Sequence, residues 1–136
     1  PVGWEFTLPT ESQWEYACRA GTTTKYSWGD DINSKLANYA DSGLKKTRAV
    51  GSYRPNAWGF FDMHGNVSEW CADWYGKYPI SSVTDPSGIA SGSLRVKRGG
   101  SWFDVETFLR SAKRYGIPPS NRYSHFGFRV GFQSSK

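Results

Sequence analysis

The chain has 136 residues and a formal net charge of +5, and its 38% hydrophobic content includes seven Trp, eight Tyr and eight Phe. This length fits a single domain with a core built mainly from aromatic rings. Lys and Arg are scattered rather than grouped, so we expect no specific nucleic-acid partner, and no apolar run is long enough to predict a membrane span. The two cysteines are too few for a disulfide scaffold and lack metal-type spacing.

The first predicted elements are a short strand and a helix. Residues 4–8 alternate as a strand does, and Thr10 then offers a good N-cap with Gln13 completing a capping box. Gly21 is the expected stop. One helix face carries residues at i, i+3 and i+4 spacing: Trp14, Ala17 and Cys18. The cysteine on that face is therefore expected to be a small buried core residue rather than a reactive thiol.

Residues 22–54 show no periodicity and are punctuated by turn-forming residues, which predicts a long ordered loop. A loop of this length inside a compact domain needs interactions that hold it in place, such as a bound ion or packed aromatic rings. Asn38, Tyr39 and Asp41 could offer oxygen ligands to an ion. A polar turn is the alternative interpretation of the same residues.

In the next segment, two carboxylates flank a Gly-Asn turn: Asp62 precedes it and Glu69 follows it. Calcium takes six to eight oxygen ligands, and such a turn aims carboxylates and carbonyls inward together. The alternative is a capped turn that leads into a strand. His64 needs no role in either interpretation.

Two more strands are predicted in the last third of the chain. Residues 94–98 alternate and run into Gly99-Gly100, where glycines permit a bulge or a close backbone approach. Residues 126–132 alternate aromatic with small or charged side chains, which predicts one closing strand with a buried face.

Between these strands, scaffold-like residues alternate with short runs that share no chemistry. The scaffold residues are Gly99, Gly100, Trp102, Arg110, Ala112, Arg114, Arg122, Gly127 and Arg129. The intervening runs are residues 103–105, 115–117 and 123–125. Variable runs on a fixed frame are suited to a surface that binds a ligand.

Four motifs together resemble the formylglycine-generating enzyme, or sulfatase-modifying factor, family: LPTESQWEYA at 8–17, DMHGNVSEW at 62–70, RGGSW at 98–102 and GFR at 127–129. The resemblance runs nearly from end to end. It implies an α+β, C-type-lectin-like fold that is rich in loops. It also implies that residues 1–136 form one sulfatase-modifying-factor-type domain, corresponding to the C-terminal portion of the usual family domain.

The resemblance also implies a structural calcium ion. In the family the turn motif is a calcium site, which assigns as ligands the side chains of Asp62 and Glu69 and the carbonyls of Gly65 and Val67. A second family site would involve residues 37–39, but its remaining ligands do not map cleanly onto this sequence.

The copper chemistry of the family is not expected here. Family enzymes bind copper through two cysteines after the Gly-Gly-Ser motif, using soft thiolates to hold Cu(I). In this chain the first position is Asp104, the second falls in a shorter region, and neither Cys18 nor Cys71 belongs to that motif. We therefore expect no copper and no formation of formylglycine.

A binding function is the first hypothesis, because the fold is also similar to that of variable proteins of diversity-generating retroelements. In those proteins, adenine-specific mutagenesis changes residues within a Gly-Gly-Ser-Trp to Gly-Phe-Arg frame, and the frame is intact here. The predicted ligand-binding residues are Phe103, Asp104, Val105, Phe108, Tyr115, Gly116, Ile117, Tyr123, Ser124 and His125. The expected partner is a protein or other macromolecular ligand at the 103–126 surface, and an ordinary loop without diversification is the alternative.

A second hypothesis is an oxidoreductase-type enzyme of the family that acts without the copper pair. Arg110, Arg114, Arg122 and Arg129 could clamp an anionic substrate, or they could brace a loop-rich fold. His125 is a possible base without a recognisable partner. A third hypothesis is an accessory domain that docks onto a neighbouring catalytic polypeptide.

Overall fold

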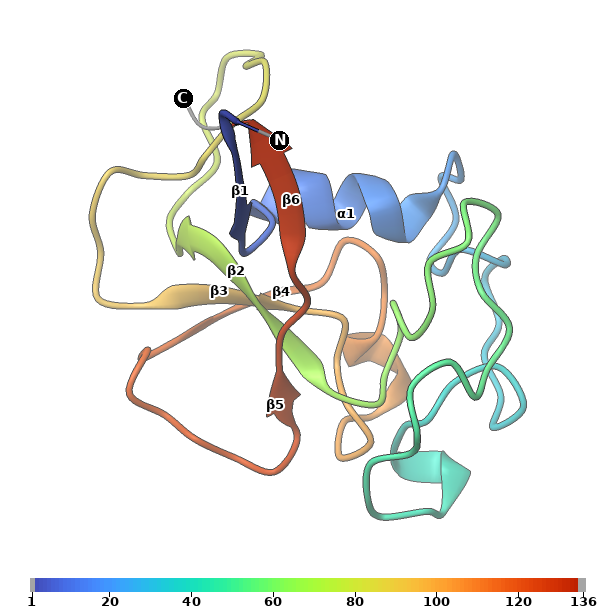
Figure 1. Ribbon diagram of the computed structural model, residues 1–136. Coiled ribbons are helices and arrows are strands. Elements are labelled where there is room, and N and C mark those ends of the chain that lie inside the picture. Colours follow the sequence, from blue (N-terminus) through green and yellow to red (C-terminus); the bar gives the residue numbers. More distant parts are fainter. Residues whose placement is uncertain (1, 135–136) are drawn as a thin grey trace.

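The structure is a computed structural model that describes residues 2–134, and it contains one helix, six strands and two short 3-10 helices (Figure 1). The helix is α1 (Glu11–Arg19), and the 3-10 helices are η1 (Ala40–Ser42) and η2 (Glu106–Phe108). The strands are β1 (Trp4–Thr7), β2 (Ser68–Trp74), β3 (Arg95–Arg98), β4 (Arg114–Ile117), β5 (Phe126–Gly127) and β6 (Gly131–Ser134). This is the loop-rich α+β architecture expected from the resemblance.

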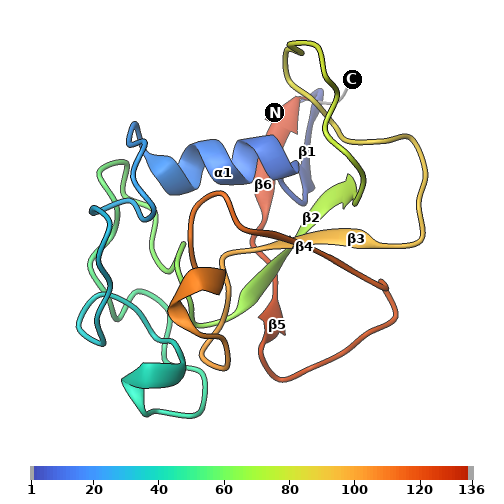
Figure 2. The same ribbon diagram turned by 180° about the vertical axis from the view of Figure 1, so that it is seen from behind.

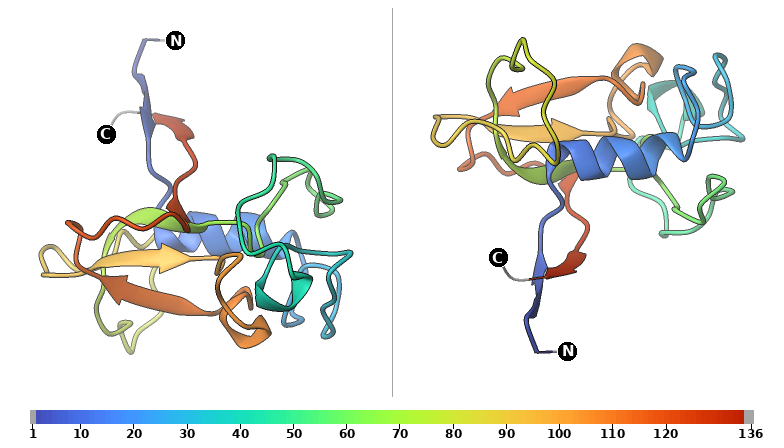
Figure 3. Two further views of the ribbon diagram at one scale, coloured as in Figure 1. Left: turned by 90° about the horizontal axis from the view of Figure 1, so that it is seen from below. Right: turned by 90° about the horizontal axis from the view of Figure 1, so that it is seen from above.

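The strands form two separate sheets. The larger has the order β4-β3-β2-β5, with β2 and β5 parallel and the other neighbours antiparallel. In the smaller, β1 pairs antiparallel with β6, and Figure 3 shows this two-stranded ribbon standing away from the larger sheet. The prediction of one closing strand over residues 126–132 was wrong, because the chain leaves the larger sheet after Gly127 and joins the ribbon at Gly131.

The predicted helix start is confirmed in atomic detail. The backbone N–H of Gln13 donates to Thr10 Oγ1 over 3.2 Å, and the backbone N–H of Thr10 donates to Gln13 Oε1 over 2.9 Å. The helix ends at Arg19, and Ala20 takes the left-handed C-cap conformation at φ 47°. The stop therefore lies one residue before the expected glycine.

One face of the larger sheet packs against α1, as Figure 2 shows from behind. The core between them consists of Trp14, Cys18, Met63, Cys71 and Val96. Both cysteines are buried free thiols, and burial raises the pKa of Cys18 to about 12. The predicted core role of Cys18 is thus confirmed, and the thiol is protonated and unreactive at neutral pH.

The long loop is tied down by aromatic packing and by buried amides. Tyr26, Ala37, Tyr39 and Leu109 form a second buried cluster. The side chain of Asn38 donates to the carbonyl of Lys46 and to Asn66 Oδ1, and it accepts from the hydroxyl of Ser42. These contacts explain how an irregular segment stays ordered.

A buried ion-pair network joins α1 to the sheet. Glu11 is 4% exposed and accepts from Arg98 Nη1 over 3.2 Å and from Arg114 Nε over 2.7 Å. Arg98 is fully buried and also donates to Glu15 and to the carbonyl of Ser111. The network thus pairs both buried charges, and of the three guanidinium nitrogens of Arg98 only Nε has no partner among the described residues.

The Gly-Gly pair before the variable-looking segment permits close packing, as predicted. Gly99 and Gly100 have φ of 88° and 66°, and a Cβ on Gly100 would lie 2.7 Å from Leu109 Cδ1. No other residue type fits this left-handed and crowded backbone without strain. Gly100 therefore packs against Leu109 of the second core cluster, while Gly99 packs against Trp14 of the first.

Candidate ligand-binding surface

The face of the larger sheet that points away from α1, called here the outer face, carries Trp70, Lys97, Tyr115 and Phe126. Lys97 lies opposite Tyr115 on β4 and opposite Trp70 on β2. Side chains alternate between the two faces of a strand, so the neighbours Val96 and Arg98 point to α1 instead. On this face Lys97 is buried and the three rings are half-buried. The segment from 118 to 125 joins the two edge strands, β4 and β5 (Figure 1).

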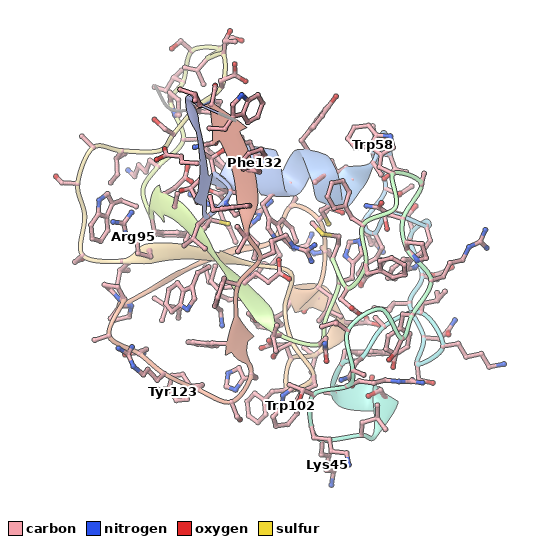
Figure 4. All side chains as sticks on the ribbon, viewed as in Figure 1. Lys45, Trp58, Arg95, Trp102, Tyr123 and Phe132 are labelled. Atoms are coloured by element: carbon pink, nitrogen blue, oxygen red, sulfur yellow. The ribbon has the colours of Figure 1, made fainter. Side chains whose placement is uncertain are left out.

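Three predicted ligand-binding residues form a stacked cluster beside this face. The ring of His125 lies 5.2 Å from that of Phe103 and 5.4 Å from that of Tyr123, in both cases near-parallel. Phe103 and Tyr123 remain 64% and 55% exposed. Trp102 contacts His125 edge-on at 6.1 Å, and Figure 4 shows Trp102 and Tyr123 on the same edge of the molecule. The cluster is an exposed aromatic surface on a fixed base.

The base of the cluster is fixed by Asp104. Its Oδ2 accepts from the hydroxyl of Ser101 over 2.6 Å and from that of Ser68 over 3.5 Å. Its backbone carbonyl accepts from the N–H of Ala40 over 3.0 Å. The carboxylate of Asp104 thus points into the frame rather than out to solvent.

The remaining predicted ligand-binding residues lie in two different environments. Val105 and Ser124 are exposed, while Phe108 and Tyr115 stack in parallel at 5.3 Å and are half-buried. Ile117 shares the outer face with Tyr115, but Gly116 lies on the other face, where an added Cβ would meet the ring of Tyr75 at 2.6 Å. Strand alternation is the reason that these consecutive residues separate.

Lys97 is a notable residue of this region that the sequence reasoning missed. It is 6% exposed, and its Nζ lies 3.5 Å from the ring centroid of Phe126 and 5.8 Å from that of Tyr115. Burial lowers its pKa to about 8, although the nearby Asp104 acts in the opposite direction. The alternation of residues 94–98 could have revealed this environment. In a strand over these residues, Lys97 and Arg95 lie on the opposite face from Val96.

Two polar atoms near the cluster are buried without a hydrogen-bond partner among the described residues: Trp102 Nε1 and Tyr115 Oη. Burial also raises the pKa of the Tyr115 hydroxyl, so the hydroxyl is protonated and can donate. Unsatisfied buried donors are rare in folded proteins and call for a physical explanation.

The predicted calcium turn keeps free oxygen positions on both carboxylates. Asp62 Oδ2 accepts from the N–H of Gly51 over 2.7 Å, and Asp62 has φ of 56°. Glu69 accepts from Trp14 Nε1 and from Arg129 Nε on Oε2, and from Arg129 Nη2 on Oε1. Since a carboxylate has about four acceptor positions, these hydrogen bonds do not occupy either carboxylate fully.

The predicted ligands of a hard cation are the side chains of Asp62 and Glu69 and the carbonyls of Gly65 and Val67, and all four are oxygen donors of the kind that calcium prefers. Within residues 2–134 no group of three or more His, Cys, Asp or Glu side chains is placed to hold a metal, so backbone carbonyls are essential to such a site. The calcium site stays a prediction. Residues 37–39, the region of the second family calcium site, have fewer free ligand atoms. The side chain of Asn38 is already hydrogen-bonded to Ser42, Lys46 and Asn66.

The four arginines do not converge into an anion clamp. Arg114 pairs with Glu11, and Arg129 pairs with Glu69. Arg110 and Arg122 are exposed and donate only to nearby carbonyls in the described chain. Arg114 and Arg129 therefore brace the fold. His64 is structural as well, because its Nδ1 lies 2.7 Å from the carbonyl oxygen of Leu109.

A large cavity of about 930 Å³ lies elsewhere, between α1, the end of β2 and residues 76–89. Its lining includes Tyr16, Trp74, Tyr78 and Ile89 but none of the predicted ligand-binding residues. No helix within residues 2–134 is long and apolar enough to cross a membrane.

The chain matches known proteins along most of its length. Residues 4–133 match the family model for the sulfatase-modifying factor enzyme 1-like domain. The chain is 37% identical over 141 residues to the formylglycine-generating enzyme of Streptomyces coelicolor, a match that covers 90% of the chain and 45% of that enzyme. It is 42% identical to the serine/threonine-protein kinase pkn1 of Chlamydia pneumoniae, a match that covers 90% of the chain and 20% of that protein.

Among solved structures, the fold is similar to that of Treponema denticola variable protein 1, with a TM-score of 0.85 and 39% identity. That alignment covers 92% of this chain and 46% of the other. The chain therefore spans less than half the length of each of these three proteins.

Proposed function

The chain belongs to the sulfatase-modifying factor enzyme 1-like domain family, and we propose that it is a non-catalytic ligand-binding domain. In this proposal the 103–126 segment presents a variable surface on a calcium-stabilised C-type-lectin-like scaffold. The natural context is a variable protein of a diversity-generating retroelement, and the ligand is a protein or another macromolecule.

The observation that carries the proposal is the stacked cluster of Phe103, Tyr123 and His125, in which Phe103 and Tyr123 are exposed and His125 between them is half-buried. Rigid aromatic side chains supply a large contact area at a low cost in conformational entropy, and this is how adaptable paratopes bind. Phe103 and Tyr123 are exposed, so their side chains can change with little effect on the packing of the core. The similarity to a solved variable protein supports the same interpretation.

Replacing the exposed residues while watching stability tests this division into frame and surface. A variant with Phe103, Val105, Tyr123 and Ser124 all replaced by Asn should keep its cooperative melt, because these side chains are exposed. As a matched control in the frame, Leu109→Ala should lose about 2–5 kcal/mol of unfolding free energy, because the side chain is fully buried. Unfolding of the surface variant would overturn the proposal.

The genetic context gives an independent test. The native gene should lie beside a reverse transcriptase gene and a near-copy of the coding sequence for residues 102–126 that differs only at adenines. Sequencing the locus checks this directly. If both features are missing, the chain is not a retroelement variable protein, although a fixed binding surface would still be open to test.

The alternative is an oxidoreductase-type enzyme or an accessory domain of the same family, and the 37% identity to a formylglycine-generating enzyme favours it. Against copper oxidation, the side chain at the first copper position is the inward-facing Asp104. The discriminating measurement is oxidation of a Cys-x-Pro-x-Arg peptide by copper-loaded protein, followed by mass spectrometry. Conversion of the cysteine to formylglycine would replace the binding proposal with the enzymatic one.

A further inference from the structure

Lys97 is a buried cation at the base of the outer face, and the described residues offer it no close counter-charge. None of the salt bridges within residues 2–134 includes it. Its ammonium faces the ring of Phe126 and, further away, that of Tyr115. Ring faces attract a cation but accept no conventional hydrogen bond, so the three N–H donors of the ammonium remain available.

Asp104 is the acidic residue that acts on the pKa of Lys97, but it forms no salt bridge with Lys97. It lies beyond salt-bridge distance, and its Oδ2 accepts from Ser101 and Ser68. It therefore reduces the cost of burying the ammonium without forming a direct bond to it. The positive charge of Lys97 is left incompletely paired, which is costly in a buried setting.

Two further donors in the same region lack an acceptor within residues 2–134. Tyr115 Oη is buried and unpartnered, and Tyr115 lies directly opposite Lys97 across β3 and β4. Trp102 Nε1 is likewise unpartnered, and the ring of Trp102 contacts that of His125. Lys97 Nζ forms no salt bridge with the described residues, and the Tyr115 hydroxyl and the Trp102 indole N–H are buried there without an acceptor. Together these donors point to an acceptor group supplied by another molecule.

Building on the proposed function, we propose that Lys97 anchors a carboxylate of the ligand, with Tyr115 as a second donor. A carboxylate fits better than a phosphate dianion, because one ammonium offsets one negative charge and Asp104 repels a second. The carboxylate belongs either to a small aromatic acid or to an acidic side chain of a peptide. Both sources present the same planar acceptor pair to the ammonium.

The test is an NMR titration of the isotope-labelled chain, read at the Trp102 indole N–H and the His125 ring. The probes are benzoate, N-acetylglutamate amide and their neutral counterparts, benzamide and N-acetylglutamine amide, at constant ionic strength. The charged probes should shift these resonances and the neutral ones should not. Which charged probe binds more tightly distinguishes an aromatic acid from a peptide side chain.

Two lysine variants locate the anchor. Lys97→Met should weaken binding of the charged probe about tenfold or more, because a charge-assisted hydrogen bond is lost. Lys113→Met is the matched control, since Lys113 lies over the same Tyr115 ring at 4.9 Å yet is only half-buried. It should bind the probe as the native chain does.

Equal shifts from charged and neutral probes, no shifts at all, or equal losses in the two variants would each overturn the assignment to Lys97. In those cases Lys97 is a buried lysine balanced by Asp104 at longer range. The proposed function is judged separately, by the tolerance of the exposed residues and by the native locus, so that the two failures are distinguishable.

Discussion

Arg129 holds the carboxylate of Glu69 through both oxygens, with Nε 2.6 Å from Oε2 and Nη2 2.8 Å from Oε1. The pair joins the Gly-Phe-Arg segment to the turn that begins at Asp62. Arg129 Nη2 also donates to the carbonyl of Phe61, so one guanidinium spans the two ends of that turn. Planar bidentate contacts of this kind fix geometry as well as charge.

Removing this guanidinium should destabilise the fold. We expect Arg129→Ala to lower the unfolding free energy by about 2–4 kcal/mol, because Glu69 is left buried without its cation; partial exposure of the arginine reduces the full cost. Urea denaturation measures the change. Arg122→Ala is the control and should change stability by less than about 0.5 kcal/mol, since that arginine is exposed. Equal effects of the two substitutions would contradict the bracing role.

Calcium should raise the melting temperature, and a chelator should lower it. A ligand that binds only the folded chain stabilises it by about 2.7 kcal/mol at one hundred times its Kd. Asp62→Asn removes a charged ligand but tolerates the left-handed backbone at φ 56°. We therefore expect this variant to need a higher calcium concentration for the same melting temperature. If the chelator leaves the native chain unchanged, the turn is structural without an ion.

Lys97→Met should stabilise the free chain at neutral pH. The native lysine has its pKa lowered to about 8 by burial, whereas the unfolded chain keeps the ordinary value of 10.5. Between pH 8 and pH 10.5 the unfolded state binds more protons than the native state. The stability of the native chain therefore rises with pH across this window, by up to about 3 kcal/mol in total. The variant should lack this rise and should be more stable below pH 8. Chemical denaturation between pH 7 and 10 compares the two, and a native curve that is flat or falls across that window would contradict the prediction.

His64 should make the fold sensitive to mild acid. Burial lowers its pKa to about 4, from 6.5 in the unfolded chain. The neutral ring donates from Nδ1 to the carbonyl of Leu109 and accepts on Nε2 from the N–H of Ser27. Between pH 6.5 and 4 the unfolded state binds the extra proton, so native stability falls with decreasing pH, by up to about 1.4 kcal/mol per pH unit.

The comparison for this effect is His64→Gln, which cannot titrate in that window. Its absolute stability is lower, so the slope with pH is the quantity to compare. Denaturation curves at pH 6.5, 5.5 and 5 should give a steeper loss for the native chain than for the variant. Parallel slopes would assign the acid sensitivity to carboxylates instead.

Local sequence patterns were sufficient to predict several elements. The capping box at Thr10, the burial of Cys18 and the crowded glycines before the variable segment all follow from residue type and short spacing. The family and its loop-rich fold follow from four motifs in order along the chain, and residues 4–133 match the family model. The local features depend on contacts between residues that are close in the sequence, and the family is identified by the four motifs taken together.

The tertiary structure decided what those patterns could not. The closing segment alternates like one strand, yet residues 126–127 and 131–134 pair with partners in two different sheets. Gly116 and Tyr115 are neighbours in the sequence, but strand alternation places only Tyr115 on the outer face.

Lys97 is not part of any recognisable sequence motif. The groups around it, Tyr115, Phe126 and Asp104, lie on other segments of the chain. In the same way, the Glu69 and Arg129 pair joins side chains 60 residues apart. The family, the helix and the glycine frame could be predicted from the amino-acid sequence, because they depend on local chemistry. The charge environment of the surface was decided only by the fold, because desolvation and pairing depend on which distant segments meet.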